Sequence, residues 1–438
     1  MKTVAFRTFG CRLNQYDTET VRTLLEQQGG WRSVPASSDP QVFVVNTCSV
    51  TAQADATARK AIRRIHREHP DSRIVVTGCY AQRAPDELAE LPGVSLIVGA
   101  ANRAHVSAKL EEVIAKTGPV EVEIAVSPIS EARTFIDVPI SEMMEHSRAY
   151  VKVQEGCDQA CSFCIVPQTR GRSRSRSRES VLAQARELIT SGYVEIVLTG
   201  VHIGDYGLDL EDGQRQLAGL ISDIIDLPGL QRFRLSSIEP SSISDDLIEL
   251  MASRDRFARH FHIPFQSGSD SVLTRMRRGY RADEFCELVE RIADKIPECG
   301  IGCDVICGFP GESDEDFQHT FDCLEQLPIT YLHPFSFSPR PGSEAETFSD
   351  QINPEDKKRR ITSLKRLMRD KNQRFREQHI GRVIPVLIEN GRRHGEANMS
   401  GWSDNYLKVE LGPGTADPVI ADVRITGLTA DGLSGEFV

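Results

Sequence analysis

Three closely spaced cysteines constrain this chain more than any other feature. Cys157, Cys161 and Cys164, here called the loop triplet, form a Cys-x3-Cys-x2-Cys run directly after a strand pattern at 150–154, with Phe163 before the last cysteine. That strand opens a series of alternating strands and helices, and parallel barrels have their active sites at the carboxyl ends of the strands. Three thiolates on one loop can hold three irons of a 4Fe–4S cubane and leave the fourth iron open for catalysis. A zinc ion would need a fourth cysteine or histidine close by, and none follows.

The pattern of apolar residues divides the chain into four segments. Residues 1–118 alternate strands and helices, which predicts a parallel α/β domain, and a linker with an edge strand follows at 119–146. Residues 147–380 contain six strand and helix units and end in a long basic helix, which predicts a partial or full (β/α) barrel. Residues 381–438 have short strands between turns, as in small all-β barrels. The predicted strands are 3–9, 41–46, 73–77, 95–98, 150–154, 194–199, 232–238, 260–265, 302–306, 332–337, 383–389, 407–411 and 419–425.

A second set of three cysteines is spread over the first segment. Cys11, Cys48 and Cys79, here called the sheet triplet, each come just after a predicted strand. Because all strand C-termini of a parallel sheet lie on one edge, we expect these thiols to meet there. Gly10 and Gly78 suit the tight turns that such positions need. A single cysteine of this kind is usually a small buried hydrophobe, but the threefold recurrence predicts a second 4Fe–4S site with an open iron.

The other five cysteines are interpreted as packing residues. Cys299, Cys303 and Cys307 are evenly spaced and could suggest a third cluster. However, a strand holds Cys303 and Cys307 about 13 Å apart on one face, and a cubane needs its thiolates closer together. Cys286 and Cys323 are assigned to packing as well.

Composition and charge limit the class of protein. The chain has no recognisable signal peptide or membrane span, so we expect a cytoplasmic protein that makes no contact with a membrane. Eleven cysteines in such a chain favour metal binding over disulfides. The net charge of -11 does not favour nucleic acid, but the local field at the contact face decides. Basic residues cluster at 59–67, 170–178 and 357–376, although such runs are often solvated surfaces.

The loop triplet resembles that of the radical SAM superfamily, and the whole chain resembles the methylthiotransferase family within it. The resemblance is closest to the bacterial branch that acts on N6-threonylcarbamoyladenosine in tRNA, because the isopentenyladenosine branch usually has Gln-Asn in place of Val201-His202. The stretches that carry the resemblance are Gly10-Cys11-Arg12-Leu13-Asn14, Asn46-Thr47-Cys48, Val76-Thr77-Gly78-Cys79, Gln154-Glu155-Gly156-Cys157, Thr169-Arg170-Gly171, Leu198-Thr199-Gly200-Val201-His202, Leu235-Ser236-Ser237-Ile238-Glu239, His262-Ile263-Pro264-Phe265-Gln266-Ser267-Gly268, Met276-Arg277-Arg278 and Gly308-Phe309-Pro310-Gly311-Glu312.

The resemblance implies a transferase with two 4Fe–4S clusters and S-adenosylmethionine. Reductive cleavage of S-adenosylmethionine at the loop triplet is expected to yield a 5′-deoxyadenosyl radical, which removes the hydrogen at adenine C2. A sulfur held at the sheet triplet is expected to be methylated by a second S-adenosylmethionine and passed to C2. In such enzymes the cofactors carry the difficult chemistry and the protein positions them.

The resemblance also implies residues around S-adenosylmethionine. Gly200 matches a strand-end position where the backbone meets the methionine group, and Phe163 is a further contact. Ser237, Glu239 and Gln266 lie near strand ends and are candidates for binding the methionine carboxylate or the ribose hydroxyls. For these three polar residues, packing inside the barrel is the alternative.

The expected partner is tRNA, whose anticodon loop can present splayed bases to a protein pocket. The C-terminal segment looks like a TRAM domain, an RNA binder in this family, but from Arg382 onward acidic residues outnumber basic ones. Phosphate contacts dominate RNA affinity, so the basic helix at 357–376 is expected to contribute. The candidate RNA-binding side chains are Arg392, Arg393, Trp402 and Tyr406 of the C-terminal segment, and Arg170, Arg172, Arg174 and Arg176.

Other partners and other functions follow from the same reasoning. We expect a monomer that needs an electron donor such as flavodoxin or ferredoxin, and a source of sulfur. One alternative function is methylthiolation of N6-isopentenyladenosine in tRNA. The other is a non-catalytic iron–sulfur protein that binds RNA or senses redox state. Electron carriers usually have four cysteine ligands, so two sets of three favour an enzyme, and conversion of S-adenosylmethionine to 5′-deoxyadenosine separates these classes.

Overall fold

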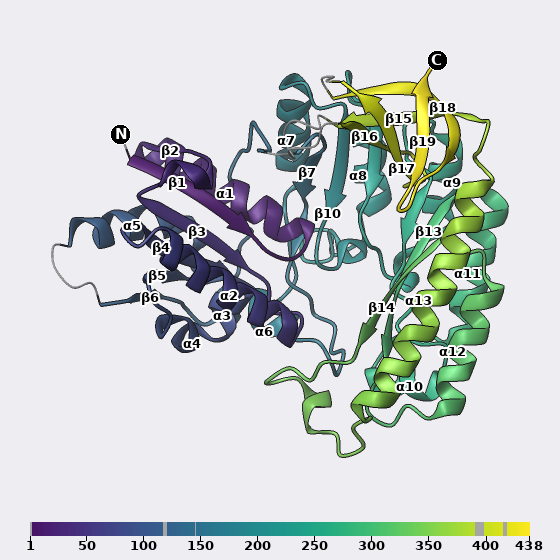
Figure 1. The fold of residues 1–438 in the computed structure, drawn as a ribbon, viewed down its shortest axis with the longest axis horizontal. Coiled ribbons are helices and arrows are strands. Elements are labelled where there is room, and N and C mark those ends of the chain that lie inside the picture. The colour runs from purple at the N-terminus through teal and green to yellow at the C-terminus, as the bar shows by residue number, and fades with distance from the viewer. Residues whose placement is uncertain (1, 117–120, 145, 390–397, 415–417) are drawn as a thin grey trace.

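The N-terminal part of the chain is a six-stranded parallel sheet in the order β2-β1-β3-β4-β5-β6 (Figure 1). The computed structural model describes residues 2–116, 121–144, 146–389, 398–414 and 418–438. The strands are β1 (Lys2–Thr8), β2 (Trp31–Ser33), β3 (Val42–Thr47), β4 (Arg73–Gly78), β5 (Val94–Val98) and β6 (Glu123–Ala125). The helices are α1 (Arg12–Gly29), α2 (Ala52–Glu68), α3 (Cys79–Arg83), α4 (Pro85–Ala89) and α5 (Val106–Ala115).

Helices cover both faces of this sheet. On one face, Leu25 of α1 and Leu110 of α5 pack with Val44 of β3. On the other face, Ile62 of α2 and Tyr80 of α3 belong to a second core cluster. Every residue of β3 is buried because the strand lies between these two layers, as is typical of parallel sheets. The edge strand β6 lies in the stretch expected to be a linker, and it pairs with β5.

The central part is a partial parallel barrel made of two three-stranded sheets, β11-β10-β7 and β12-β13-β14. Among the described residues no pairing joins β7 to β14, so the barrel is open on that side. The six strands agree with the prediction from sequence. They are β7 (Ala149–Lys152), β10 (Glu195–Thr199), β11 (Arg232–Leu235), β12 (His260–His262), β13 (Gly300–Cys307) and β14 (Tyr331–Ser336), with the short pair β8 (Gln154–Glu155) and β9 (Arg174–Ser175). The helices are α6 (Val166–Arg170), α7 (Arg178–Thr190), α8 (Leu217–Ile225), α9 (Asp245–Ser253), α10 (Asp270–Met276), α11 (Ala282–Lys295), α12 (Asp314–Gln326) and α13 (Pro354–Glu377).

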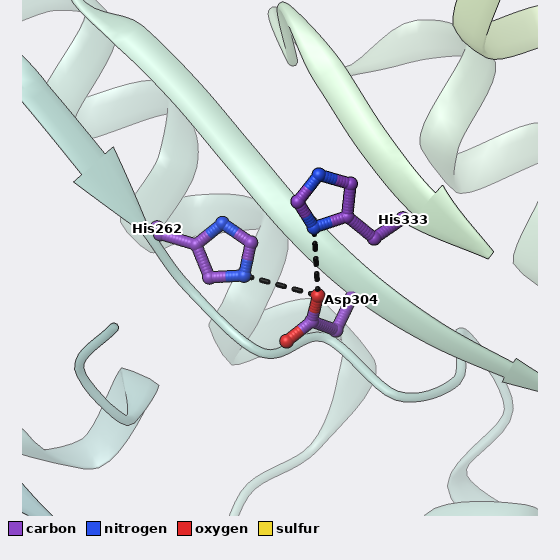
Figure 2. A group of neighbouring side chains, drawn as sticks. All are labelled: His262, Asp304 and His333. Carbon is purple, nitrogen blue, oxygen red and sulfur yellow. Dashed lines mark ion pairs between the residues drawn. The ribbon is translucent and has the colours of Figure 1, made fainter. Parts of the chain in front are cut away.

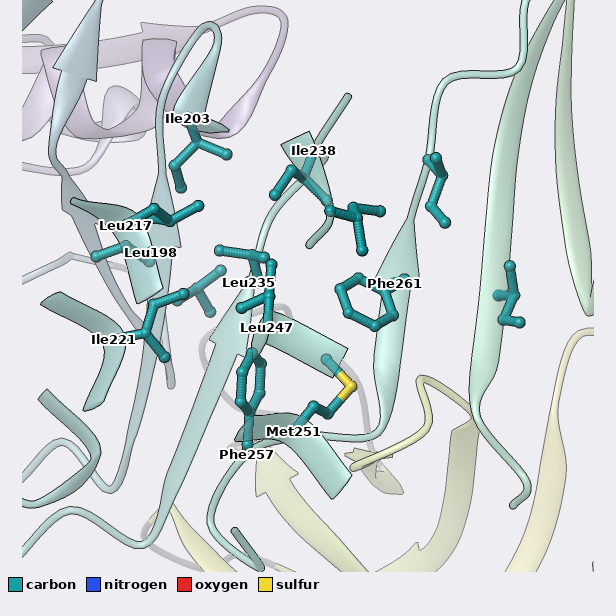
Figure 3. Close-up of a cluster of buried hydrophobic side chains, with 14 of the residues drawn as sticks. Leu198, Ile203, Leu217, Ile221, Leu235, Ile238, Leu247, Met251, Phe257 and Phe261 are labelled. Carbon is teal, nitrogen blue, oxygen red and sulfur yellow. The ribbon is translucent and has the colours of Figure 1, made fainter. Parts of the chain in front are cut away.

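The largest hydrophobic core lies between the barrel strands and these helices. Leu198 of β10, Leu235 of β11 and Phe261 of β12 belong to it, together with Leu217 of α8 and Met251 of α9 (Figure 3). Alternate residues of a strand point to opposite faces, so the remaining side chains of these strands point into the open barrel. That interior is where polar groups can gather.

The C-terminal part is a closed five-stranded barrel in the order β15-β16-β17-β19-β18. Sequence patterns predicted three of its strands and missed β16 and β19, which are short and contain few apolar residues. Buried Arg234 of β11 fixes it to the central barrel by donating to the carbonyls of Ser403 and Asp404 at 2.9 and 2.8 Å. In the described part of the chain no helix has the length and apolarity to span a membrane. The strands are β15 (Val383–Glu389), β16 (Asn398–Ser403), β17 (Lys408–Pro413), β18 (Val419–Leu428) and β19 (Leu433–Phe437).

Candidate active site

The loop triplet lies between β8 and α6, beyond the C-terminal end of the first barrel strand. The Sγ of Cys157 accepts a hydrogen bond from the Gln159 N–H at 3.4 Å, and the Sγ of Cys164 accepts one from the Val166 N–H at 3.4 Å. Burial raises the pKa of Cys157 to about 12 and that of Cys164 to about 11, because it disfavours the charged thiolate. Iron reverses this effect, since a coordinating thiol is deprotonated by the metal.

Arg278 is a functional candidate that the sequence patterns did not single out, although it closes the Met276-Arg277-Arg278 stretch of the resemblance. Its guanidinium donates to the Sγ of Cys161 at 3.4 Å and forms an ion pair with Glu239, which is only partly exposed. A cation beside a cluster ligand stabilises thiolate charge and tunes the reduction potential of the cluster. Glu239 therefore reaches the loop triplet through Arg278.

The sheet triplet comes together at the C-terminal edge of the N-terminal sheet. Cys11 precedes α1, Cys48 follows β3, and Cys79 begins α3 directly after β4. Burial, together with the nearby Cys79 and Cys11, raises the pKa of Cys48 to about 12, so the three thiols lie close enough to interact. Gly10 has φ of +100°, and a Cβ added there would lie 2.7 Å from Cys48 Cβ, so only glycine lets the two segments approach this closely.

Neither triplet has the close spacing of a site for a single metal ion. Among the described residues, only one group of potential ligands has all its donor atoms within 4.8 Å, and it contains no cysteine. At least two sulfurs of each triplet are therefore more than 4.8 Å apart. A cubane does not need its thiolates as close as one ion does, because each thiolate binds a different iron.

A buried network of charges joins the N-terminal sheet to the barrel between the two triplets. Asp17 of α1 accepts from Arg103 Nη1 at 3.0 Å and from Lys152 Nζ at 2.7 Å, and it pairs with Arg170 Nη2 at 3.0 Å. Glu155 pairs with Arg170 Nη1 at 2.9 Å and with Lys152 Nζ at 3.1 Å. All five side chains are at most 3% exposed. The residues are far apart in sequence, so no local pattern could have revealed the network.

We expect the replacement Asp17→Asn to lower the free energy of unfolding by about 3–5 kcal/mol, because it leaves buried cations without their counter-charge. Burial by itself would raise the pKa of Asp17, but Arg103, Lys152 and Arg170 lower it below its usual value. The carboxylate therefore stabilises the fold above pH about 3.9, and this contribution is lost as the pH falls from there toward the lowered pKa. Urea unfolding under anaerobic conditions measures the effect. The exposed control Asp246→Asn should change it by less than about 0.5 kcal/mol, and an equal effect of both variants would contradict the role of Asp17.

The structure corrects the expectation that the Arg-x-Arg run contacts phosphates. Arg170, Arg174 and Arg176 are 3%, 6% and 2% exposed, and their guanidinium groups bond within the protein. Arg174 donates to the Arg170 carbonyl at 2.9 Å, and Arg176 donates to the Tyr16 hydroxyl at 3.1 Å. Of the four arginines expected to bind RNA in this run, only Arg172 is exposed at the surface. Arg392 and Arg393, expected to bind RNA, lie outside the described residues.

The candidate S-adenosylmethionine residues lie at the same end of the barrel as the loop triplet. Gly200 follows β10, and a Cβ added there would lie 3.2 Å from Gln154 Oε1. Exposed Ser237 follows β11, and buried Gln266 follows β12 with φ of +65°, a strained left-handed conformation of the kind found at functional sites. Phe163 packs beside a small core cluster that contains Phe309 and Phe337, so packing accounts for its position.

The five remaining cysteines lie away from both triplets. Cys299, Cys303 and Cys307 are buried in the main hydrophobic core. Cys286 of α11 and Cys323 of α12 pack against that core with their Sγ atoms 2.7 Å apart.

Replacing Cys299, Cys303 and Cys307 with Ala, Val and Val should therefore leave the iron content of the anaerobically reconstituted protein unchanged. These thiols are buried in the main hydrophobic core, which contains none of the six triplet cysteines. Iron and protein assays measure the number of irons per chain, with the wild-type chain as the reference. A loss of about four irons would reveal a third cluster.

Three cysteines on the loop after the first strand of a partial parallel barrel define the radical SAM class of enzymes. Residues 151–324 match the Radical SAM superfamily, and residues 3–99 match the Uncharacterized protein family UPF0004. A solved structure with a similar fold is the radical S-adenosylmethionine methyltransferase TsrM from Kitasatospora setae. It has a TM-score of 0.59 and 17% identity over 79% of this chain and 77% of that chain.

Curated relatives are similar over nearly the whole length. Threonylcarbamoyladenosine tRNA methylthiotransferase MtaB of Bacillus subtilis is 37% identical over 98% of this chain and 94% of that protein. The protein of the same name from Aquifex aeolicus is 37% identical over 88% of this chain and 92% of that protein. The tRNA-2-methylthio-N(6)-dimethylallyladenosine synthase of Syntrophotalea carbinolica is 33% identical over 100% of both chains. The chain therefore belongs to the tRNA methylthiotransferase family of radical SAM enzymes, and its cofactors include S-adenosylmethionine and a 4Fe–4S cluster.

Proposed function

We propose that this enzyme transfers a methylthio group to C2 of N6-threonylcarbamoyladenosine at position 37 of tRNA. The observation that supports the proposal is that a buried charge network joins two parts of the protein, each of which carries a set of three cysteines. Similarity to relatives named as threonylcarbamoyladenosine tRNA methylthiotransferases supports this choice of substrate.

The residues of the loop triplet would hold one 4Fe–4S cluster, and those of the sheet triplet would hold a second. When bound, the two groups supply radical formation from S-adenosylmethionine and a carrier for the transferred sulfur. The protein contributes the geometry: Arg278 and the backbone N–H groups of Gln159 and Val166 donate to the thiols of the loop triplet. Asp17 and Glu155 hold Arg170 at the junction between the two parts. Rigid support of this kind is what positions a substrate atom between two reacting groups.

We propose that the tRNA approaches along α13 and the open edge of the barrel at β14. A cavity of about 670 Å³ lies there, and Lys365 and Arg369 of α13 line it together with Phe335 of β14. Both basic side chains are exposed, and the Phe335 ring is 45% exposed. Cations that follow a backbone beside an exposed aromatic ring are typical of surfaces that bind single-stranded nucleic acid. The anticodon loop is the part of a tRNA that presents such a strand.

The remaining partners follow from the chemistry. A reductant of the flavodoxin or ferredoxin kind would supply electrons to the loop triplet, and a separate source would supply sulfur. We propose that the chain acts as a monomer in the cytoplasm, where its tRNA substrate is found.

Mass spectrometry of tRNA nucleosides from a strain that lacks the gene tests the function. We expect 2-methylthio-N6-threonylcarbamoyladenosine to disappear and N6-threonylcarbamoyladenosine to accumulate, because the modification has lost its enzyme. A plasmid with the wild-type gene should restore the product, and one with Cys157→Ala should not. An unchanged level of the methylthio nucleoside would refute the proposal.

A further inference from the structure

A second group of potential ligands lies inside the barrel, apart from the cysteines. His262 is the last residue of β12, Asp304 lies in the middle of β13, and His333 lies near the start of β14 (Figure 2). The neighbours of Asp304 on β13, Cys303 and Val305, are fully buried in the main core, so Asp304 points to the opposite face, into the open barrel. The three adjacent strands thus present two imidazoles and a carboxylate to one point.

The distances fit a metal ion. His262 Nε2 lies 3.0 Å and His333 Nδ1 lies 3.3 Å from Asp304 Oδ1, and all three donor atoms are within 4.8 Å of one another. Two ligands bound at about 2.0–2.1 Å in tetrahedral geometry lie about 3.3 Å apart. Two histidines and one carboxylate form a donor set that binds zinc or ferrous iron and leaves coordination positions open.

The buried histidine is oriented for this role. Tyr331 Oη lies 3.0 Å from His262 Nδ1 and 2.7 Å from His260 Nε2. In the tautomer in which His262 Nδ1–H donates a hydrogen bond to Tyr331 Oη, the lone pair of His262 Nε2 faces Asp304. Metal-binding histidines are commonly held in this way by a hydrogen bond to the second ring nitrogen. The geometry therefore accommodates the tautomer that a metal requires.

Contacts place this group beside the candidate active site. The Gln266 N–H donates to the carbonyl of Asp304 at 2.8 Å, and Gln266 is a candidate S-adenosylmethionine residue. On the other side, the His260 ring stacks on Tyr406 at 4.4 Å, and Arg12, which follows Cys11, donates to the Tyr406 hydroxyl at 3.0 Å. The group thus lies between elements that carry the sheet triplet and elements near the loop triplet.

We propose that His262, Asp304 and His333 bind one divalent transition-metal ion, and that the ion coordinates the oxygen-bearing substituent of the substrate base. The side chain of His333 is 53% exposed and that of Asp304 is 25% exposed, so an ion bound there would be accessible to solvent and to a substrate. The second half of the proposal rests on the proposed function, because the threonylcarbamoyl group carries a carboxylate and a hydroxyl. Both are oxygen ligands that such an ion accepts.

Mn²⁺ serves as the probe for the first half. Holoenzyme with both clusters oxidised is freed of loose metal by dialysis and titrated with Mn²⁺, and the electron paramagnetic resonance signal of the free ion is followed. The wild-type chain should bind one Mn²⁺, and Asp304→Asn or His333→Gln should abolish this binding. Tyr331→Phe should weaken it by about 10- to 100-fold, because it removes only the orienting hydrogen bond. The exposed control Asp246→Asn should bind as the wild type does.

The iron content of each variant is measured in parallel, so that a lost cluster is not mistaken for a lost ion. If the wild-type chain binds neither Mn²⁺ nor Zn²⁺, or if Asp304→Asn binds as tightly as the wild type, the group is a hydrogen-bonded cluster only and the site is overturned. These measurements use no tRNA, so they do not depend on the proposed function.

The nucleoside N6-threonylcarbamoyladenosine tests the second half. It should raise the affinity for Mn²⁺ at least severalfold, whereas adenosine should not, since linkage makes the two ligands strengthen each other equally. If the site binds Mn²⁺ but the nucleoside does not change that affinity, the proposed contact between ion and substrate is overturned, whereas the metal site itself stands. If the enzyme instead reacts preferentially with tRNA that carries the isopentenyl base, the proposed function is contradicted, whatever the Mn²⁺ titration shows.

Discussion

Replacing Cys157, Cys161 and Cys164 together with alanine should remove half of the iron and all cleavage of S-adenosylmethionine. Two sites of one 4Fe–4S cluster each imply about eight irons per reconstituted chain, and only the loop triplet lies on the active-site end of a radical SAM barrel. The half-buried loop forms no part of the main core, so the variant should fold. Iron analysis and detection of 5′-deoxyadenosine after reduction measure both effects.

The reciprocal variant separates the two sites. Replacing Cys11, Cys48 and Cys79 with alanine should remove the other half of the iron, keep the cleavage of S-adenosylmethionine, and abolish formation of the methylthio product. The reason is that the sheet triplet lies on a different domain and is not needed to form the radical. If both triple variants kept their full iron content, the assignment of two clusters would be wrong.

The enzyme should discriminate between the two candidate bases by roughly four orders of magnitude in favour of N6-threonylcarbamoyladenosine. A site built to pair polar groups rejects an analogue that lacks them, because the site's polar groups lose water on binding and gain no hydrogen bond from the analogue. The barrel interior is of this kind: His262, Asp304, His333 and Tyr331 form a connected polar surface there. An isopentenyl group would offer these side chains no hydrogen bond.

Single-turnover reactions with matched tRNAs measure this preference. Two transcripts of identical sequence, one bearing each modification at position 37, are incubated with reconstituted enzyme, and the methylthio nucleosides are quantified by mass spectrometry. An unmodified transcript serves as the control and should give no product. Faster reaction of the isopentenyl tRNA would contradict the assignment of N6-threonylcarbamoyladenosine as the substrate but not the radical chemistry. The isopentenyl base is the relevant competitor because some relatives are named as dimethylallyladenosine synthases.

The arrangement of strands was predictable because its signal is local. Runs such as Val42–Thr47, buried along their whole length, are recognisable as strands of a parallel sheet from their apolar residues alone. Because parallel strands end on one edge, the sequence then predicts that Cys11, Cys48 and Cys79 lie close together, although up to 68 residues separate them in sequence. The strands β16 and β19 escaped detection because they are short and contain glycine and serine, which leaves little apolar pattern to recognise.

The arginines at 170–176 show where local reasoning fails. Alternating Arg and Ser resembles an exposed basic loop, yet Arg176 is buried because it reaches Tyr16 of another domain. No pattern within the run could predict that Arg176 is buried, because its partner Tyr16 lies 160 residues away in the sequence. The same limit applies to Asp17 with Lys152.

The sequence by itself determined the class of fold, the two sets of cysteines and the family, because apolar periodicity and short cysteine spacings are properties of neighbouring residues. Only the tertiary structure decided which charges are buried between the domains, that Arg278 meets Cys161, and that His262, Asp304 and His333 converge. These contacts join strands and domains that are distant in the chain. Their existence depends on the packing of whole elements against one another, and that packing is set by the complete fold and not by any segment of it.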